Sequence, residues 1–193
     1  FIVGYEDGNL DLFQNGNFFE ISDIKDKSDL TTKRINSFTV LAEEIYISTS
    51  FGVVIYNLAK REFKDSWILD IEIHGLAVYN NYFLIATEAG ILQCDINNPL
   101  ISSIDSWSLF SNDTKAFKAI QVFADKVLGI KMISSTSYQF FSYDGIVWTK
   151  VSDITNFGDL QVNDNQVVVV GSGSIRLYSS DLNLEDSKDS FAI

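Results

Sequence analysis

A strand pattern that recurs about every 40 residues constrains the fold of this chain more than any other feature. Each copy has a short strand ending in valine, a polar turn, a longer apolar strand, a small-residue turn and a third strand. The valines are spaced by 38, 44 and 40 residues, and they are Val40, Val78, Val122 and Val162. A period of this size is typical of repeat architectures in which each repeat is one supersecondary unit.

A fourth segment follows these strands in copies one to four. It carries a tryptophan in copies two, three and four (Trp67, Trp107 and Trp148), and "GNFFEISDI" holds the same place in copy one. Four strands in 38 to 44 residues match one blade of a β-propeller. The second strands, such as "IYIS" and "FLIA", are near-continuous apolar runs, as expected of strands buried on both faces. Little of the chain reads as helix, and "LAKREFKD" (residues 58–65) is predicted to be a connection.

The chain opens with "VGYEDGNLDLF", two short apolar runs around a polar turn, which fits the second and third strands of a blade. The first copy then lacks its inner strand, and we expect further sequence upstream of Phe1. The sequence predicts an all-β fold, a β-propeller of about four and a half four-stranded antiparallel blades. Residues 1–193 form one partial propeller domain in this interpretation. Its blade units are approximately residues 1–33, 34–73, 74–115, 116–157 and 158–193.

The open edges of the first and last copies lead to a further expectation. The final segment, residues 179–193, is polar with a short apolar tail and defines no clear outer strand. Free edges leave backbone donors and apolar blade faces in water. We therefore expect the chain to be part of a larger ring that includes other blades, or to pair edge to edge with a neighbouring chain.

Composition narrows the classes of partner. The net charge of −12 argues against a nucleic acid, which basic patches recognise, and against adhesion to an anionic lipid surface. The single cysteine, Cys94, excludes an internal disulfide and is predicted to be a buried thiol. No apolar run approaches the roughly 20 residues of a membrane helix, so direct membrane insertion is not expected.

Candidate sites are few. His74 has the chemistry of a general base, but no nucleophile motif accompanies it, and a plain loop histidine is the favoured interpretation. A zinc site would need more histidines or cysteines. The stretch "EDGNLD" has the acidic character of a calcium loop but misses the spacing of one, so a hairpin turn explains it better. We predict no enzyme, no catalytic or metal-binding residue and no cofactor.

Aromatic residues supply the remaining candidates. Trp67, Trp107 and Trp148 recur at one blade position, which predicts packing between neighbouring blades. Phe51 lies at a hairpin tip and is the candidate for an exposed ligand contact, because glycans stack on exposed aromatic rings.

A family resemblance adds to this interpretation. The stretches "GYEDGNLDL", "ISDIKDKSDLTTKRINSFTV" and "YISTSFGVVIYNLAKREFKDSW" resemble the N-terminal propeller of the PorZ family of the type IX secretion machinery of Bacteroidetes. The resemblance is closest over residues 1–70 and fades after Trp107. It implies an exported protein of the cell surface or outer membrane with two propellers and a C-terminal secretion domain. It further implies a non-catalytic role in handling anionic lipopolysaccharide or scaffolding cargo attachment, with secretion proteins or a glycolipid as partners.

A second resemblance keeps another class open. The stretch "YISTSFGVVIYN" is similar to the two-component-regulator propeller repeat of periplasmic sensor domains in hybrid histidine kinases. That resemblance implies a ligand-sensing periplasmic propeller. A C-terminal secretion domain in the full-length sequence would favour the first class, and a membrane helix followed by a kinase would favour the second.

Overall fold

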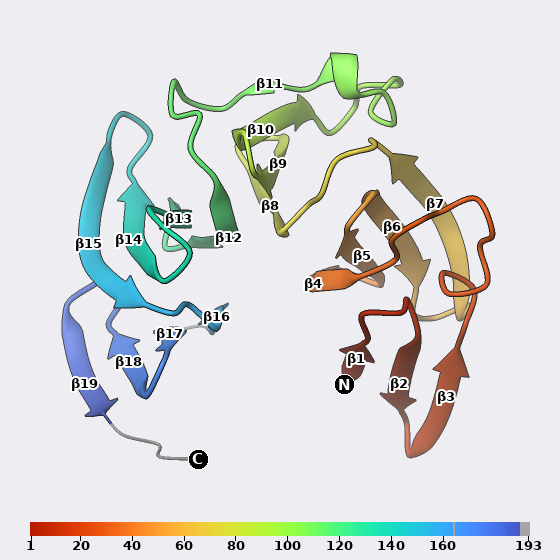
Figure 1. Ribbon diagram of the computed structural model, residues 1–193, viewed down its shortest axis with the longest axis horizontal. Coiled ribbons are helices and arrows are strands. Elements are labelled where there is room, and N and C mark those ends of the chain that lie inside the picture. Colours follow the sequence, from red (N-terminus) through yellow and green to blue (C-terminus); the bar gives the residue numbers. More distant parts are fainter. Residues whose placement is uncertain (164, 190–193) are drawn as a thin grey trace.

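The computed structural model describes residues 1–163 and 165–189 and arranges them as five antiparallel sheets around a common centre (Figure 1). Blade 1 has three strands, β1 (Ile2–Gly4), β2 (Leu10–Gln14) and β3 (Asn17–Ile21). Blades 2 and 3 have four strands each: β4 (Ile35–Leu41), β5 (Glu44–Thr49), β6 (Gly52–Asn57) and β7 (Glu62–Ile68); then β8 (Gly75–Tyr79), β9 (Tyr82–Thr87), β10 (Gly90–Asp95) and β11 (Ser108–Leu109). Blades 4 and 5 follow the same plan: β12 (Phe117–Phe123), β13 (Lys126–Met132), β14 (Ser137–Tyr143) and β15 (Trp148–Thr155); then β16 (Asp159–Val162), β17 (Val167–Gly171), β18 (Ser174–Tyr178) and β19 (Leu184–Asp189).

The predicted all-β propeller is confirmed, with five blades where about four and a half were predicted. The first blade has only three strands, which agrees with the predicted lack of its inner strand. The polar segment at the end of the chain supplies β19, which pairs with β18 from Tyr178↔Leu184 to Ser174↔Asp189. A polar sequence suits this place, since an outer strand has solvent on one face. The apolar tail noted in the sequence, residues 190–193, lies outside the described residues, and the assignment of unit boundaries stays a prediction.

Helical structure is sparse in the described part of the chain. It comprises one short 3₁₀ turn, η1 (Ile104–Ser106), between β10 and β11. None of the helical structure in the ranges described is long and apolar enough to cross a membrane. The predicted connection at residues 58–65 is partly wrong, because β7 already begins at Glu62 after a turn in which Arg61 has a φ of 57°.

The inner strands line the centre of the molecule. Strand β4 contacts β8, β8 contacts β12, and β12 contacts β16, so the first strand of each complete blade faces the common axis (Figure 1). The second strands β5, β9 and β13 are mostly buried on both faces, as their apolar runs predict, whereas in β17 of the last blade only one face is buried.

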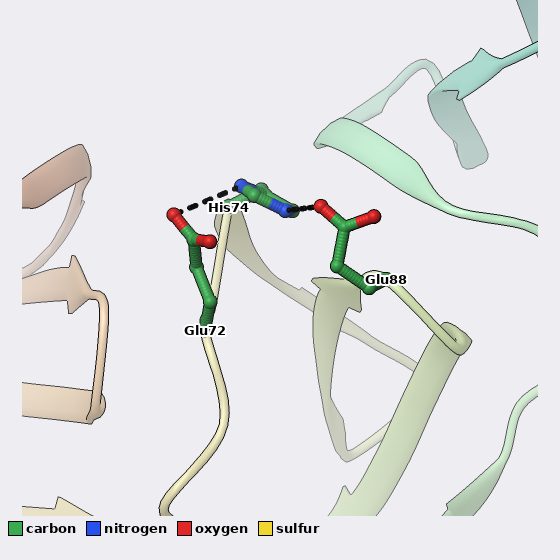
Figure 2. A group of neighbouring side chains, drawn as sticks. All are labelled: Glu72, His74 and Glu88. Atoms are coloured by element: carbon green, nitrogen blue, oxygen red, sulfur yellow. Dashed lines mark hydrogen bonds and ion pairs between the residues drawn. The ribbon is translucent and has the colours of Figure 1, made fainter. Parts of the chain in front are cut away.

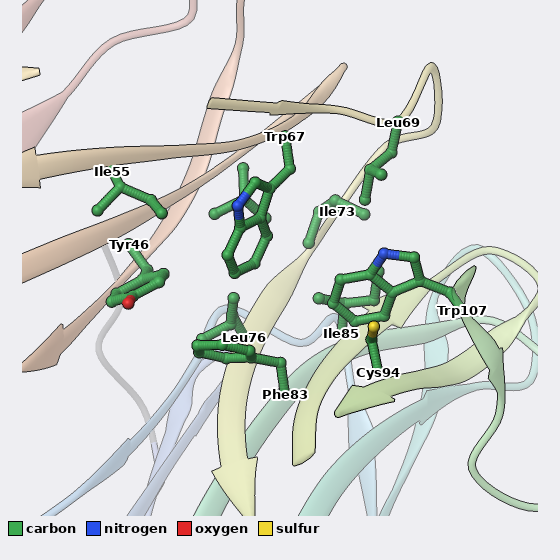
Figure 3. Close-up of a cluster of buried hydrophobic side chains, with 11 residues drawn as sticks. Tyr46, Ile55, Trp67, Leu69, Ile73, Leu76, Phe83, Ile85, Cys94 and Trp107 are labelled. Atoms are coloured by element: carbon green, nitrogen blue, oxygen red, sulfur yellow. The ribbon is translucent and has the colours of Figure 1, made fainter. Parts of the chain in front are cut away.

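Apolar clusters fill the spaces between successive blades. The cluster between blades 2 and 3 brings Trp67 and Trp107 together with their ring centroids 6.0 Å apart (Figure 3). Phe83 packs edge-on against Trp67 at 5.0 Å, and Cys94 is buried beside them, as predicted. Burial, with the charge of Glu44, raises the pKa of Tyr46 in the same cluster to about 12.

The three tryptophans do not occupy one blade position, so this part of the prediction is wrong. Trp67 pairs with Val53 at the start of β6, whereas Trp148 pairs with Tyr143 at the end of β14. Trp67 and Trp107 are buried between blades as expected, but Trp148 is only half-buried, and its indole nitrogen has no hydrogen-bond partner. Sequence spacing placed all three on fourth strands but could not give the register within each strand.

The turns between the second and third strands of blades 2 and 3 are small-residue turns, as the sequence predicts. Thr49 Oγ1 donates a hydrogen bond to the carbonyl of Gly52 at 2.9 Å, and Thr87 Oγ1 does the same to Gly90 at 2.8 Å. A Cβ on Gly52 would lie 1.9 Å from the carbonyl oxygen of Trp67, and the residue has a φ of 147°. Glycine at this position therefore lets the outer strand approach the turn closely.

Candidate functional site

A cavity of about 440 Å³ lies between the inner strands of blades 2 to 5. Its lining is strongly polar at the end where these strands begin, and it includes Asn36, His74, Lys118, Asp159 and Gln161. The turn between β9 and β10 adds Glu88 beside His74. Side chains from four blades therefore meet at the mouth of the central channel.

Backbone irregularities aim two of these side chains into the site. In β4 the pairing passes from Ile35↔Thr49 to Ser37↔Ser48, which leaves Asn36 as an extra residue. In β12 the pairing passes from Phe117↔Lys131 to Ala119↔Ile130, which leaves Lys118 in the same situation. Such β-bulges redirect a side chain and are over-represented beside functional sites.

His74 occupies the corresponding place in blade 3. Its backbone nitrogen donates to the carbonyl of Ala86 at 2.8 Å, although the partner of Ala86 in the ladder is Gly75. Asn36, His74 and Lys118 each precede the repeat valine of their blade by four residues. The repeat thus places one residue of each of three successive blades at the channel mouth.

His74 lies between two glutamates, one on each side of its ring (Figure 2). Its Nε2 is 2.8 Å from Oε1 of Glu88, and its Nδ1 is 3.9 Å from Oε1 of Glu72. The Lys118 ammonium lies 3.1 Å from the same Nε2 and also pairs with Glu88. Only 9% of the His74 side chain is exposed, so the imidazole is held within this network.

Glu72 is held from the other side by blade 2. Arg34 forms an ion pair with it, and the amide of Asn36 donates to Oε1 of Glu72 at 3.1 Å and to the carbonyl of Ile73 at 2.8 Å. Arg34 and Glu72 each precede their repeat valine by six residues, so they are equivalent positions of consecutive blades. The network consequently links blades 2, 3 and 4, with one cation–carboxylate pair on each side of His74.

These surroundings shift the acid–base equilibria of the network. Burial lowers the pKa of His74 despite the hydrogen bond to Glu88, and the charge of Lys118 lowers it further. The hydrogen bond from Lys118 holds the pKa of Glu88 below its ordinary value. Burial alone would raise the pKa of Glu72, but Arg34 and His74 outweigh it and leave the pKa lowered. At neutral pH the site therefore holds a neutral imidazole between two carboxylates and two cations.

A neutral His74 cannot satisfy both neighbours of its Nε2 at once. With a proton on Nε2 the ring donates to Glu88, and without one it accepts from Lys118. The site is therefore able to exchange hydrogen-bond partners with little movement.

The structure corrects two expectations about single residues. His74 lies in the loop before β8, as expected, but it is not a plain loop histidine, because its side chain is 9% exposed and lies within a charged network. The expected exposure of Phe51 is wrong: its surface is 4% exposed, and it packs between blades 1 and 2, since the tight turn folds the ring back over the sheet. A ligand role for Phe51 stays untested.

The predicted hairpin turn at "EDGNLD" is confirmed. The backbone nitrogen of Tyr5 donates to the carbonyl of Asn9 at 3.0 Å, and the Asp7 carboxylate accepts from the Asn9 backbone nitrogen at 3.1 Å.

Sequence reasoning missed the network around His74. Glu72, Glu88 and Lys118 are its neighbours, and Arg34 and Asn36 hold Glu72. A signal for three of the mouth residues was present in the repeat. Reading the column four residues before the valines gives Asn36, His74 and Lys118 in blades 2 to 4, and Gly158 in blade 5.

The geometry defines a class of protein: an antiparallel β-propeller in which the inner strands of successive blades present polar side chains at one end of the central channel. The family model of the type IX secretion PorZ N-terminal β-propeller domain matches residues 1–108, more than half of the chain. The chain belongs to the PorZ N-terminal β-propeller family, which confirms the resemblance seen in the sequence.

Solved structures share this fold. PorZ of Porphyromonas gingivalis, described as an essential bacterial surface component of the type IX secretion system, superposes with a TM-score of 0.79 at 14% identity, over 98% of this chain and 25% of that chain. The extracellular domain of the putative one-component system BT4673 from B. thetaiotaomicron gives a TM-score of 0.60 at 11% identity, over 99% of this chain and 28% of that chain. The WD40 domain of Toxoplasma gondii coronin gives 0.60 at 12% identity, over 96% and 54%.

At these identities the likeness shows the fold alone. The chain spans about a quarter of the length of the PorZ chain that it matches. No curated protein sequence matches it.

Proposed function

We propose that this propeller is a non-catalytic, surface-exposed module of the type IX secretion machinery that handles anionic lipopolysaccharide for cargo attachment. Membership of the PorZ N-terminal propeller family supports the secretion role. The single observation that supports ligand handling is the convergence of Asn36, His74 and Lys118 on the channel mouth. Amide, imidazole and carboxylate groups together offer the donors and acceptors that sugar hydroxyls need.

The anionic part of such a ligand requires cations that can change partners. Lys118 and Arg34 are now paired with Glu88 and Glu72, and 52% of the Glu88 side chain is exposed. The Lys118 and Glu72 side chains are only 23% and 27% exposed, but their partners are about half exposed, so each pair contributes on the order of 1 kcal/mol. A ligand phosphate can therefore replace the carboxylate at a modest cost. This local exchange allows a chain with a net charge of −12 to bind an anion at one point.

Binding of purified lipopolysaccharide to the immobilised full-length protein tests the proposal. Material that carries the anionic polysaccharide should bind, and material from an otherwise identical strain without it should not. Arg34→Met with Lys118→Met should reduce binding about tenfold or more, because charge-assisted hydrogen bonds are lost. The matched control replaces Lys64 on the outer strand β7 and Lys150 on the outer strand β15 with Met; these lysines form ion pairs with Glu44 and Asp153. Equal binding of both materials, or an equal loss in the control, would overturn the proposal.

Protein partners are part of the same proposal, because blade faces at both ends of the arc offer contact surfaces. The outer face of blade 1 exposes Phe13 and Phe18, the latter to 62%, whereas Leu10 and Leu12 on its other face are buried against blade 2. We propose that further blades or a neighbouring chain cover this face. Light scattering on residues 1–193 should show association, or a denaturant titration should show poorly cooperative unfolding. A monodisperse monomer with one sharp transition would contradict this expectation.

A ligand-sensing periplasmic propeller of a hybrid two-component kinase is the second candidate. The structural similarity to the extracellular domain of BT4673 supports it, and the family match favours the secretion role over it. The full-length sequence distinguishes the two, through a C-terminal secretion domain or a membrane helix followed by a kinase.

A further inference from the structure

We propose that His74 and Glu88 bind a divalent transition-metal ion of the Zn²⁺ type, that Glu72 orients the imidazole, and that the Lys118 ammonium takes the place of the ion when no metal is bound. This inference goes beyond the proposed function and does not depend on it. It concerns a cluster in which one ligand atom of each of Glu72, His74 and Glu88 lies within 4.8 Å of the others.

The donor types and their spacing suit such an ion. Zinc binds carboxylate oxygen as well as imidazole nitrogen, at about 2.0–2.2 Å, so the lack of further histidines and cysteines in the sequence does not exclude it. Two donors of a tetrahedral site then lie about 3.3 Å apart. Nε2 of His74 and Oε1 of Glu88 are 2.8 Å apart, so both can reach one ion with a small rotation of the Glu88 side chain. Two protein ligands leave two positions of a tetrahedral site for water, one more than in zinc sites with three protein ligands, so the expected affinity is correspondingly lower.

Glu72 is placed as the orienting partner. Histidines that bind metals usually donate their second ring N–H to a carboxylate, carbonyl or water, which fixes the tautomer. Oε1 of Glu72 faces Nδ1 of His74 at 3.9 Å (Figure 2). This is beyond hydrogen-bond distance, so the two groups must approach by a few tenths of an ångström or more before Nδ1 can donate. Arg34 and Asn36 hold the carboxylate in turn. This arrangement leaves the Nε2 lone pair directed away from Glu72, toward the side where Glu88 and Lys118 lie.

The position of Lys118 is an independent indication that a cation is favoured here. Its ammonium lies 3.1 Å from Nε2 and pairs with Glu88, so a positive charge already touches both of the proposed ligands. Accepting from an ammonium requires an unprotonated Nε2, which is also the form that binds a metal. Lys118 has a long stem and enters from a different blade, so it can leave without moving the ligands.

Zinc titration of the chelator-treated full-length protein against a chromogenic indicator tests the site. The wild-type protein should bind one more zinc ion per chain than His74→Ala and Glu88→Gln variants. Glu72→Gln should weaken the affinity about tenfold, the usual consequence of losing an outer-shell partner. Lys118→Met should tighten binding about fivefold or more, since the competing ammonium of a weak surface pair is removed.

Lys64→Met is the matched control, because it removes an ammonium paired with Glu44 on the outer strand β7 and should leave zinc affinity unchanged. Glu88 lies on a half-exposed turn, so Glu88→Gln reports on the site even if His74→Ala perturbs folding. The proposal is overturned if wild-type protein and Glu88→Gln bind the same number of zinc ions. It is also overturned if Lys118→Met binds no more tightly than Lys64→Met.

Discussion

Blades 2 and 3 are joined in two places by different kinds of interaction. Between the sheets, Trp67, Phe83 and Trp107 form an apolar cluster from which water is excluded. At the channel mouth, Glu72, His74 and Glu88 join the same blades through charges and hydrogen bonds. The first contact has one good arrangement of close-packed rings, and the second has several arrangements of similar energy. We infer that the cluster stabilises the fold while the mouth stays free to exchange partners.

The largest expected effect comes from opening the apolar cluster. Trp67→Ala should lower the free energy of unfolding by about 3–5 kcal/mol, because a 3% exposed indole is removed from contact with Tyr46, Phe83 and Trp107. Denaturant titration followed by circular dichroism measures the loss. Trp148→Ala is the control and should lose less than half as much, because that ring is half-buried. Equal losses would show that the cluster between blades 2 and 3 contributes no more to the free energy of unfolding than the packing around Trp148.

A smaller effect is expected where the turn of blade 2 meets its outer strand. Gly52→Ala should destabilise the protein by about 2 kcal/mol or more, because the added Cβ would clash with the Trp67 carbonyl 1.9 Å away. Gly16→Ala is the comparison, since that glycine also has a positive φ but no atom within 4 Å of the added Cβ. Thermal melts of both variants should rank Gly52→Ala as clearly worse. The reverse order would contradict the close approach seen at Gly52.

The mouth should contribute little to stability. Lys118→Met removes an ammonium from a pair with the half-exposed Glu88, and we expect a change below about 1 kcal/mol in the free energy of unfolding. The same denaturant titration checks it. A loss comparable to that of Trp67→Ala would mean that the charged network also holds the blades together, which would contradict the difference inferred between the mouth and the apolar cluster.

The smallest effect is a pH dependence at the edge of the cluster. The hydrogen bond from Lys64 lowers the pKa of Glu44, helped by the bond from Tyr46 and opposed by burial. A carboxylate with a lowered pKa contributes stability that is present above its ordinary pKa near 4.5 and is lost as pH falls through the folded value. Between pH 7 and pH 4, Glu44→Gln should therefore lose less stability than the wild type, by under about 1 kcal/mol. Parallel pH curves for the two proteins would exclude this contribution.

The fold was largely predictable from the sequence because the repeat carries two physical signals. Apolar second strands such as residues 83–86 mark double-sided burial, and threonine–glycine turns mark the hairpins of blades 2 and 3. Strand β19 was not predictable, because an outer strand with mostly exposed polar residues has no apolar alternation to reveal it.

The site was less predictable, for a different reason. His74 was recognised as the only histidine, but its neighbours come from three blades and meet only after the ring of sheets forms. The bulges at Asn36 and Lys118 depend on ladder register, which the apolar pattern does not specify at strand ends. Phe51 shows the same limit, since a turn position predicted exposure and the fold buried the ring.

The most direct test of the account measures stability and ligand binding on one protein, the double variant Arg34→Met and Lys118→Met. If the mouth binds anions and the apolar cluster holds the blades, this variant should lose anionic lipopolysaccharide binding about tenfold or more while its free energy of unfolding falls by less than about 2 kcal/mol. A variant that unfolds readily but binds as well as the wild type would contradict the account, because the charged network would then be structural and the ligand would bind elsewhere.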